Sequence, residues 1–244
     1  MSLSEQIKSE LDVIQANVPK VYDKGFKDGV TSTEEEKGTM NIKYVNRIAH
    51  LFNGVRFSDV QKIVIDAYDE LSECNYAFGN CEGTLKTVVI NAPNNTDITS
   101  VSFQNCFSNN EVIEEVDLSG MDTYEGIVIT TQGFNAMFNF ASSLKTIKGR
   151  LNPYNAQNYQ YAFNQCSALE DVEFISGSIY PSWNSGISFL RCSKLTDKSI
   201  QSIIDGLCDL TGETAQKLSL HTNVINKLTD EQKVQILSKN WTVG

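Results

Sequence analysis

The sequence lacks most of the features that a catalytic or metal-binding site requires. Its 244 residues include two histidines, His50 and His221, and neither stands in a recognisable motif. The patterns G-x-S-x-G, Walker A and G-x-G-x-x-G, which would indicate a nucleophile or a phosphate loop, are absent. None of the six cysteines belongs to a C-x-x-C pair, which zinc sites commonly use. We therefore expect no enzyme, no cofactor and no metal.

Positive charge and long apolar runs are also scarce. The chain has 30 Asp and Glu against 20 Lys and Arg, a net charge of −10 and a pI near 4.7. We expect no nucleic acid partner, because phosphate binding needs clustered basic residues. No apolar run approaches the ~20 residues that span a bilayer, so no membrane span is expected. The first residues show no signal peptide, which favours a cytoplasmic or virion-associated protein; removal of a signal from a longer precursor is the alternative.

What the sequence does contain is a repeated phrase of one apolar residue, two variable residues, one apolar residue, one variable residue and a third apolar residue. The copies begin at Val60, Leu85, Ile113, Leu144, Leu169 and Ala215. The starts lie 25, 28, 31, 25 and then 46 residues apart, and a period in the twenties is typical of stacked repeats. We expect an α/β fold, a right-handed solenoid with one parallel sheet. Its predicted strands are 60–65, 85–90, 113–118, 144–148, 169–174 and 215–220, with further strands on the return side of the coils at 98–103 and 126–130.

A second phrase, a phenylalanine followed three residues later by a small side chain, recurs five times. The pairs are Phe78 with Cys81, Phe107 with Asn110, Phe138 with Ala141, Phe163 with Cys166, and Phe189 with Cys192. One repeat buries too little apolar surface to offset the entropy lost in ordering about 25 residues. Neighbouring repeats must share a core, and the phenylalanines are expected to form an internal column. Cysteine in this slot is interpreted as a small buried hydrophobe, with a disulfide or a metal ligand as alternatives.

The two phrases together resemble one known family. Residues 161–174 read Tyr-Ala-Phe-Asn-Gln-Cys-Ser-Ala-Leu-Glu-Asp-Val-Glu-Phe, and residues 77–90 follow the same pattern with one extra residue. This pattern is similar to that of BspA-like leucine-rich repeat proteins over about residues 50–220, and the resemblance implies a leucine-rich repeat fold. Ordinary leucine-rich repeats carry Asn or Cys three residues after the last strand position. This chain has other residues there, so the usual asparagine ladder is not expected: Tyr68, Pro93 and Met121.

The N-terminal segment, residues 1–30, is predicted to be helical. Its apolar stripe has heptad spacing and consists of Ile7, Leu11, Ile14, Val18 and Val21. Pro19 is expected to kink or restart the helix. The stripe needs a partner, which is either the edge of the solenoid or a second copy of the chain. A homo-oligomer formed through residues 4–22 is therefore one interpretation.

Residues 31–43 are interpreted as a polar linker, and residues 44–244 as the repeat domain. A short helical stretch from Tyr44 to Phe52 is expected to cover the first strand. At the other end, residues 195–244 are expected to form a helical cap. Its first helix begins at Thr196 or Asp197. Its second begins with a capping box at Thr229–Gln232, carries Val234, Ile236 and Leu237, and is closed by Trp241.

Both ends of the chain resemble a second group of proteins. The tail runs from Leu195-Thr-Asp-Lys-Ser-Ile to Asn240-Trp-Thr-Val, and the leader Asn17–Gly25 reads Asn-Val-Pro-Lys-Val-Tyr-Asp-Lys-Gly. Both are similar to leucine-rich repeat proteins encoded by phages and prophages of Gram-positive gut bacteria. The resemblance implies a virion- or tail-associated setting.

Two sets of side chains are candidates for binding a ligand. The first consists of carboxylates in the variable slots of the strand phrase, which point out of the sheet: Glu114, Asp117, Glu170 and Glu173. They could hold a cation or a basic partner, or form a solvated face. The second set consists of aromatic residues among Asn and Ser, which suit sugar rings or a protein hot spot: Tyr154, Tyr159, Tyr180 and Trp183. The alternative is that Tyr161 is core and that these four cover loops.

These features favour a non-catalytic recognition or adhesion module. Its ligand would be a protein or a glycan, because each repeat adds side chains to one regular face. The alternative is a structural or assembly subunit that oligomerises through its N-terminal helix.

Overall fold

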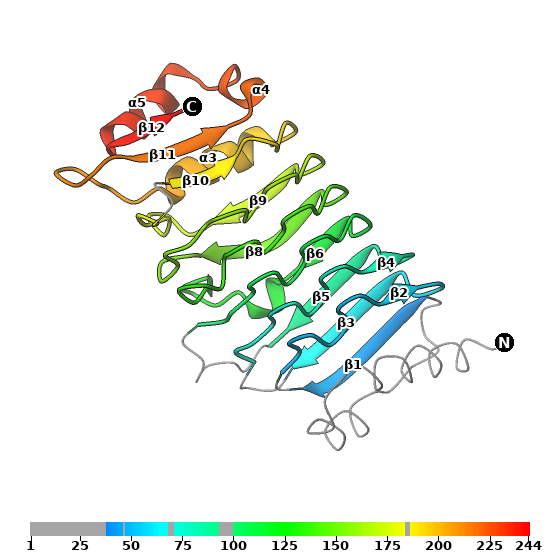
Figure 1. Cartoon of the computed structure of the whole chain (residues 1–244). Coiled ribbons are helices and arrows are strands. Elements are labelled where there is room, and N and C mark those ends of the chain that lie inside the picture. Colours follow the sequence, from blue (N-terminus) through cyan, green and yellow to red (C-terminus); the bar gives the residue numbers. More distant parts are fainter. Residues whose placement is uncertain (1–37, 46, 68–70, 93–99, 184–185) are drawn as a thin grey trace.

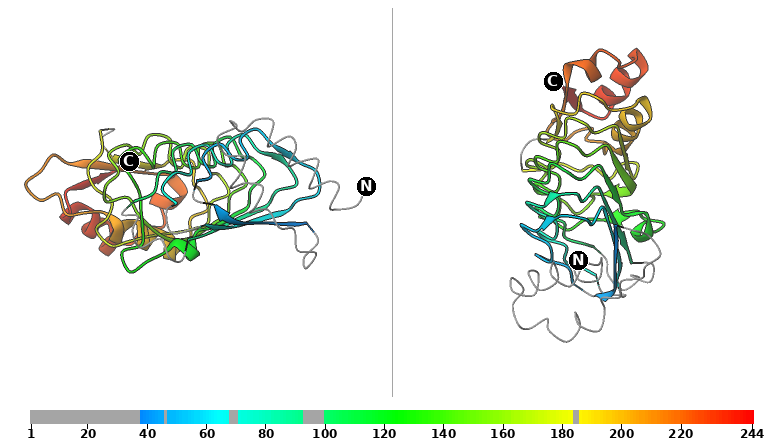
Figure 2. Two further views of the ribbon diagram at one scale, coloured as in Figure 1. Left: turned by 90° about the horizontal axis from the view of Figure 1, so that it is seen from below. Right: turned by 90° about the vertical axis from the view of Figure 1, so that its right-hand side faces the viewer.

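The chain forms an α/β structure in which successive circuits of the backbone, here called coils, lie side by side in sequence order (Figures 1 and 2). The computed structural model describes residues 38–45, 47–67, 71–92, 100–183 and 186–244. Its strands are mostly parallel and its helices are few. The predicted helical segment at 1–30, its association region at 4–22 and most of the 31–43 linker lie outside the described residues.

The largest sheet is parallel and takes one main strand from each coil. Its strands are β1 (Thr39–Val45), β3 (Lys62–Ala67), β5 (Thr87–Asn91), β6 (Glu115–Asp117), β8 (Thr146–Asn152) and β9 (Asp171–Phe174), and β7 (Ile127–Val128) pairs with the end of β8. The register aligns one buried apolar residue from each of five strands: Met40, Ile63, Val88, Val116 and Ile147. This row forms the sheet side of the core.

Five predicted strands are confirmed, and each begins two residues later than its phrase. The first apolar residue of a phrase, such as Val60 or Leu85, is buried just before its strand rather than within it. The return side of the coils is less regular than predicted. It contains β7 and isolated parallel bridges, among them Val101–Ile129 and Glu73–Ser102. A short parallel pair, β2 (Arg56–Phe57) with β4 (Glu82–Gly83), lies just before the main strands β3 and β5.

The predicted column of phenylalanines is confirmed and is one ring longer. The rings stack at centroid distances of 5.2, 5.5, 5.4, 5.7 and 4.6 Å along Phe52, Phe78, Phe107, Phe138, Phe163 and Phe189. All six side chains are buried. Because each ring contacts the ring of the next coil, the column joins the coils on the side opposite the sheet.

A second chain of contacts runs beside this column, through the segments 50–54, 76–80, 105–109, 136–140 and 161–165, here called the turn rail. In each segment the residues two before and two after the phenylalanine have positive φ. The N–H of the phenylalanine then points at the next coil. The N–H of Phe52 donates to the Ala77 carbonyl and that of Phe78 to the Cys106 carbonyl, both at 2.8 Å. The N–H of Phe107 donates to the Met137 carbonyl and that of Phe138 to the Ala162 carbonyl, both at 2.9 Å. Neighbouring rail N–H groups bond in the same direction.

Where the small residue three after a phenylalanine is Cys or Asn, its side chain donates to a carbonyl of the preceding coil. The Sγ of Cys166 donates to the Phe138 carbonyl at 3.0 Å, and the Nδ2 of Asn110 donates to the Phe78 carbonyl at 3.0 Å. Cys81 and Cys192 make the same contact with Phe52 and Phe163. All six cysteines are free and buried, as predicted. Burial raises the pKa of Cys81 and Cys192 to about 12, so the thiols stay protonated donors.

The N-terminal expectations for residues 39–52 are wrong. Residues 39–43, predicted as linker, belong to β1, which pairs in parallel with β3. In the stretch predicted as a helix, Tyr44 and Val45 belong to β1 and residues 49–52 form turns, of which 50–52 belong to the turn rail. The reason is that Met40 and Ile42 match the strand phrase and Phe52 matches the column. These residues therefore form an additional coil.

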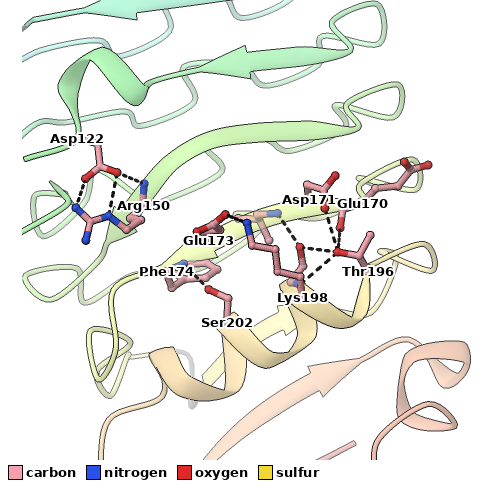
Figure 3. A network of polar contacts seen from close by, with 11 residues as sticks. Asp122, Arg150, Glu170, Asp171, Glu173, Phe174, Thr196, Lys198 and Ser202 are labelled. Carbon is pink, nitrogen blue, oxygen red and sulfur yellow. Dashed lines mark hydrogen bonds and ion pairs between the residues drawn. The ribbon is translucent and has the colours of Figure 1, made fainter.

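The helix α3 (Asp197–Gly206) ends the large sheet. Thr196 caps it by accepting from the Ser199 N–H, as predicted. The helix lies where the next strand would be, and its hydroxyls accept from β9: Val172 N–H bonds Ser199 Oγ at 3.0 Å and Phe174 N–H bonds Ser202 Oγ at 2.9 Å (Figure 3). The expectation that residues 215–220 continue this sheet is therefore wrong.

Those residues form β11 (Gln216–Leu220) in a separate parallel sheet with β10 (Gly186–Phe189) and β12 (Trp241–Val243). Two helices complete the cap, α4 (Thr222–Ile225) and α5 (Asp230–Ser238), and a 3-10 turn, η2 (Ser119–Met121), lies earlier in the chain. The predicted capping box of Thr229 and Gln232 is present, and Trp241 is buried. Of the apolar residues predicted on this helix, Ile236 is buried, whereas Val234 and Leu237 are exposed.

Candidate binding site

The exposed tyrosines of the predicted aromatic set meet at a pocket of about 530 Å³. It opens between the coil that carries Tyr154 and the following segment, which carries Tyr180. The remaining lining residues are small or amide side chains: Ser100, Thr130, Thr131, Asn155, Ala156, Gln157 and Pro181. The structure thus brings together two predicted residues that are one coil apart in the sequence.

Tyr154 and Tyr180 form one wall of this pocket. Their ring centroids are 4.8 Å apart and the rings meet edge to face at 77°. They remain 54% and 39% exposed, so the pair is not part of the core. The backbone beneath Tyr154 is held in place, because its N–H donates to the Oδ1 of Asn152 at 3.1 Å. Fixed aromatic rings at a pocket edge suit a ligand that has an apolar face.

Tyr159, a member of the same predicted set, is buried and is not a surface contact. Its side chain is 3% exposed, and burial raises its pKa above the usual value for a tyrosine. Its hydroxyl accepts from the Tyr180 N–H at 3.1 Å and donates to the Pro153 carbonyl at 3.4 Å. Tyr159 therefore ties together the two backbone segments that present the exposed rings.

Trp183 is exposed but stands outside the pocket. Its side chain is 65% exposed, and its backbone N–H donates to the Gln157 carbonyl at 3.0 Å. Gln157 lines the pocket, so this bond places Trp183 beside it. Of the four predicted aromatic residues, two line the pocket, one lies next to it and one supports it from below.

No charged side chain lines the pocket among the described residues. The polar groups are the hydroxyls of Ser100, Thr130 and Thr131 and the amides of Asn155 and Gln157. Hydroxyl and amide groups donate and accept hydrogen bonds without a net charge. The arrangement offers no carboxylate or imidazole for acid–base chemistry, and it suits a neutral, hydroxyl-rich ligand.

The predicted carboxylates are arranged differently, because most are paired with cations of adjacent coils. Glu114 bonds Lys145 at 2.7 Å and Lys86 at 3.2 Å. The hydrogen bond from Lys145, followed by that from Lys86, lowers the pKa of Glu114. The Nζ of Lys148 lies 2.9 Å from Glu115 and 3.8 Å from Asp117. These side chains connect coils and do not form a row of free carboxylates.

Toward α3 the same pattern continues (Figure 3). Glu173 pairs with Lys198 of α3, and Asp171 accepts from the Thr196 hydroxyl at 3.0 Å. Glu170 forms no ion pair within the described part of the chain, and its carbonyl accepts from the Thr196 N–H. A bidentate pair, Arg150 with Asp122, lies on the neighbouring coil. The predicted acidic site is therefore a set of contacts between coils.

Several pocket residues have no distinguishing signal in the sequence. Thr130 and Thr131 belong to the coil before Tyr154 and follow a strand-like stretch, which gave no reason to place them at a ligand. The run from Asn152 to Asn158 is rich in Asn and Gln, which is also typical of turns. These side chains lie close to the tyrosines only because neighbouring coils stack side by side.

No protein-family model, curated protein or solved structure matches the chain. Within the residues that the structure describes, no helix is both long and apolar enough to cross a membrane. The kind of ligand that the pocket suits is therefore inferred from its lining residues.

Proposed function

We propose that this protein is a non-catalytic recognition module that binds a glycan in the pocket of Tyr154 and Tyr180. The observation that carries the proposal is an exposed, edge-to-face tyrosine pair on an uncharged pocket of hydroxyl and amide groups. A sugar ring has an apolar C–H face that packs on aromatic rings and hydroxyls that exchange hydrogen bonds with amides. The pocket supplies both kinds of contact.

The scaffold in this proposal is a right-handed leucine-rich repeat solenoid of the BspA-like type. The aligned apolar row of the sheet and the column of stacked phenylalanines support it, because both recur once per coil. Such a stack holds side chains from adjacent coils at a fixed spacing. A wall formed by one tyrosine from each of two coils therefore needs little ordering when a ligand binds.

A protein ligand is the second candidate and is supported by Trp183. Tryptophan and tyrosine are the residue types that most often dominate protein interfaces, and Trp183 stands exposed beside the pocket. A protein would cover Trp183 together with the tyrosine pair, whereas a sugar held in the pocket would contact the pair alone. The two ligands therefore differ in their dependence on Trp183.

Alanine substitutions test this proposal. Tyr154→Ala and Tyr180→Ala should each weaken glycan binding about thirtyfold, as expected for a dominant aromatic contact. Tyr124→Ala is the matched control, because Tyr124 is 96% exposed and does not line the pocket. The measurement is screening on immobilised bacterial and host glycans followed by titration calorimetry. Equal affinities for the Tyr154 and Tyr124 variants would contradict the proposed site.

We also propose that the full chain self-associates through residues 4–22, which would make weak binding multivalent. The support is the apolar stripe of that segment, and the resemblance of residues 17–25 and 195–243 supports a virion-associated setting. Light scattering should show the mass fall to a single chain when residues 1–30 are removed. A full chain that is monomeric at high micromolar concentration would contradict self-association, and the assembly role would fail with it.

A further inference from the structure

The backbone ladder of the turn rail stops at one junction. In the coils from Phe52 to Phe138, the rail N–H groups donate to the next coil. In the described residues, no hydrogen bond joins the backbone of residues 161–165 to that of residues 186–190. The rings of Phe163 and Phe189 still stack at 4.6 Å, so the two segments remain neighbours. The N–H groups of Tyr161, Phe163 and Gln165 are left without backbone partners on this side.

A groove of about 370 Å³ lies at this junction. One side carries Gln160, Tyr161 and Asn164, and the other carries Ser188 of β10, with Lys217 and Ser219 of β11. Tyr161, which the sequence suggested as core, has positive φ and is 56% exposed. The groove thus combines an exposed aromatic ring, amide and hydroxyl groups and one cation.

The peptide groups of the rail add a positive potential to this groove. In the coils of Phe78, Phe107 and Phe138, the peptide group that accepts from the preceding coil also donates to the following coil, as the Ala77–Phe78 group does. Its dipole therefore points along the stack, and aligned peptide dipoles add as they do in a helix. The positive end of the series is at residues 161–165, where the donors are unpaired. Free N–H groups at such an end favour an anion.

The charges of the lining side chains also favour an anion in the groove. Lys217 is the one charged residue among the lining residues of the groove and of the tyrosine pocket, although the chain has 30 Asp and Glu. In the part of the chain that the structure describes, Lys217 forms no ion pair, whereas Lys145 and Lys148 are paired with carboxylates. Lys217 and Tyr161, a residue at the positive end of the rail, therefore line one groove.

The groove and the tyrosine pocket lie along the same seam, with residues 154–165 on one side and residues 180–183 and 186–189 on the other. The Gln157–Trp183 backbone bond crosses this seam, with the pocket before it and the groove after it. Gln157 lines the pocket and Gln160 lines the groove, so their Cα atoms are at most about 11 Å apart. A ligand of a few linked units can reach from one to the other.

We infer that this seam is one extended site for a linear oligosaccharide that carries anionic units. A neutral unit packs on Tyr154 and Tyr180, and an anionic unit lies at Tyr161 and Lys217. The inference rests on the proposed function and deepens it, because it sets the length and the charge of the glycan.

The test compares two series of oligosaccharides of matched length by titration calorimetry on the full chain. Fully N-acetylated chitin oligosaccharides of two to six units are neutral, and hyaluronan fragments of the same lengths carry a carboxylate on alternate units. We expect affinity to rise with length, and long hyaluronan fragments to bind about tenfold more tightly than neutral chains, which is the weight of a charge-assisted hydrogen bond. Lys217→Gln should remove that tenfold difference, while Lys194→Gln, an exposed lysine that does not line the groove, should keep it.

Tyr161→Ala supplies an independent readout. It should weaken the long fragments of both series about tenfold or more and leave the shortest sugars unchanged, because the groove lies at the far end of the site. If short sugars bind through Tyr154 but neither length nor charge improves affinity, the extended site is overturned and the proposed function stands. If no member of either series binds, both are overturned.

Discussion

The regular coils and the C-terminal end of this protein satisfy the groups of the neighbouring coil in different ways. Each regular coil satisfies its neighbour with equivalent groups: a strand on one side, and a phenylalanine with a rail N–H on the other. At the C-terminal end the sheet side and the rail side are completed by different elements. On the sheet side the hydroxyls of α3 replace a strand, and on the rail side β10 keeps the ring stacking but not the backbone bonds. The difference shows that ring stacking does not depend on the backbone ladder.

The largest expected effect tests the column at the junction of the two regions. Phe163→Ala should reduce the free energy of unfolding by about 3–5 kcal/mol, because it leaves a cavity between buried rings. The matched control is Phe140→Ala, two residues from the column, where the ring is 42% exposed; its effect should stay within about 0.5 kcal/mol. Urea denaturation measures both. A similar loss in the two variants would show that the column does not hold the coils together.

The next effect tests how α3 ends the sheet. Ser199→Ala leaves the Val172 N–H without its acceptor and should cost about 1–3 kcal/mol, reduced by the better helix propensity of alanine. Hydrogen exchange should be faster at Val172 in this variant. Ser193→Ala, in the turn before the helix, is the control. Unchanged exchange at Val172 would mean that the hydroxyl does not replace the missing strand.

A smaller effect tests the slot that follows each phenylalanine. Cys166→Ala removes the donor to the Phe138 carbonyl, and the reverse change, Ala141→Cys, supplies a donor toward the Phe107 carbonyl of the preceding coil. We expect opposite shifts of about 0.5–1.5 kcal/mol in the free energy of unfolding. If Ala141→Cys destabilises the protein, this position requires a small side chain and not a hydrogen-bond donor.

The smallest effect concerns the paired carboxylates of the strand face. Its lysine partners lower the pKa of Glu114, so this group stabilises the fold above its usual value of about 4.5 and loses that contribution as the pH falls through the lowered value. The urea midpoint of Glu114→Gln should approach that of the unchanged protein below this pH. The difference should also shrink in high salt, because the pair is exposed. A difference between the two urea midpoints that persists in acid would contradict the ion-pair explanation.

Local patterns predicted much of the fold. The strand phrase places its second and third apolar residues on the buried face, and the spacing of Phe107 and Phe138 predicts a stacked column, because these features depend only on neighbouring coils. The capping box at Thr229 depends on four residues and was also predictable. By contrast, residues 215–220 carry the strand phrase but pair with β10, because α3 occupies the edge of the large sheet. No local pattern encodes that choice.

The site was less predictable, because it depends on which way each tyrosine points. Tyr159 and Tyr161 are two residues apart, and the sequence suggested Tyr161 for the core, but Tyr159 is buried and Tyr161 is exposed. Tyr161 has the positive φ of the turn rail, whereas Tyr159 does not. Tyr154 and Tyr180 were predicted as candidates, yet their contact follows from the stacking of two coils.

The one-way direction of the turn rail makes the coils interchangeable units. The coils of Phe78, Phe107 and Phe138 each accept from the coil before and donate to the coil after through equivalent positions. A chain without residues 79–107 would present the N–H of Phe78 to the carbonyl of Met137, which Phe107 now contacts. Insertion or deletion of a whole coil can therefore change the length of the protein while the seam, the groove and the C-terminal cap are kept.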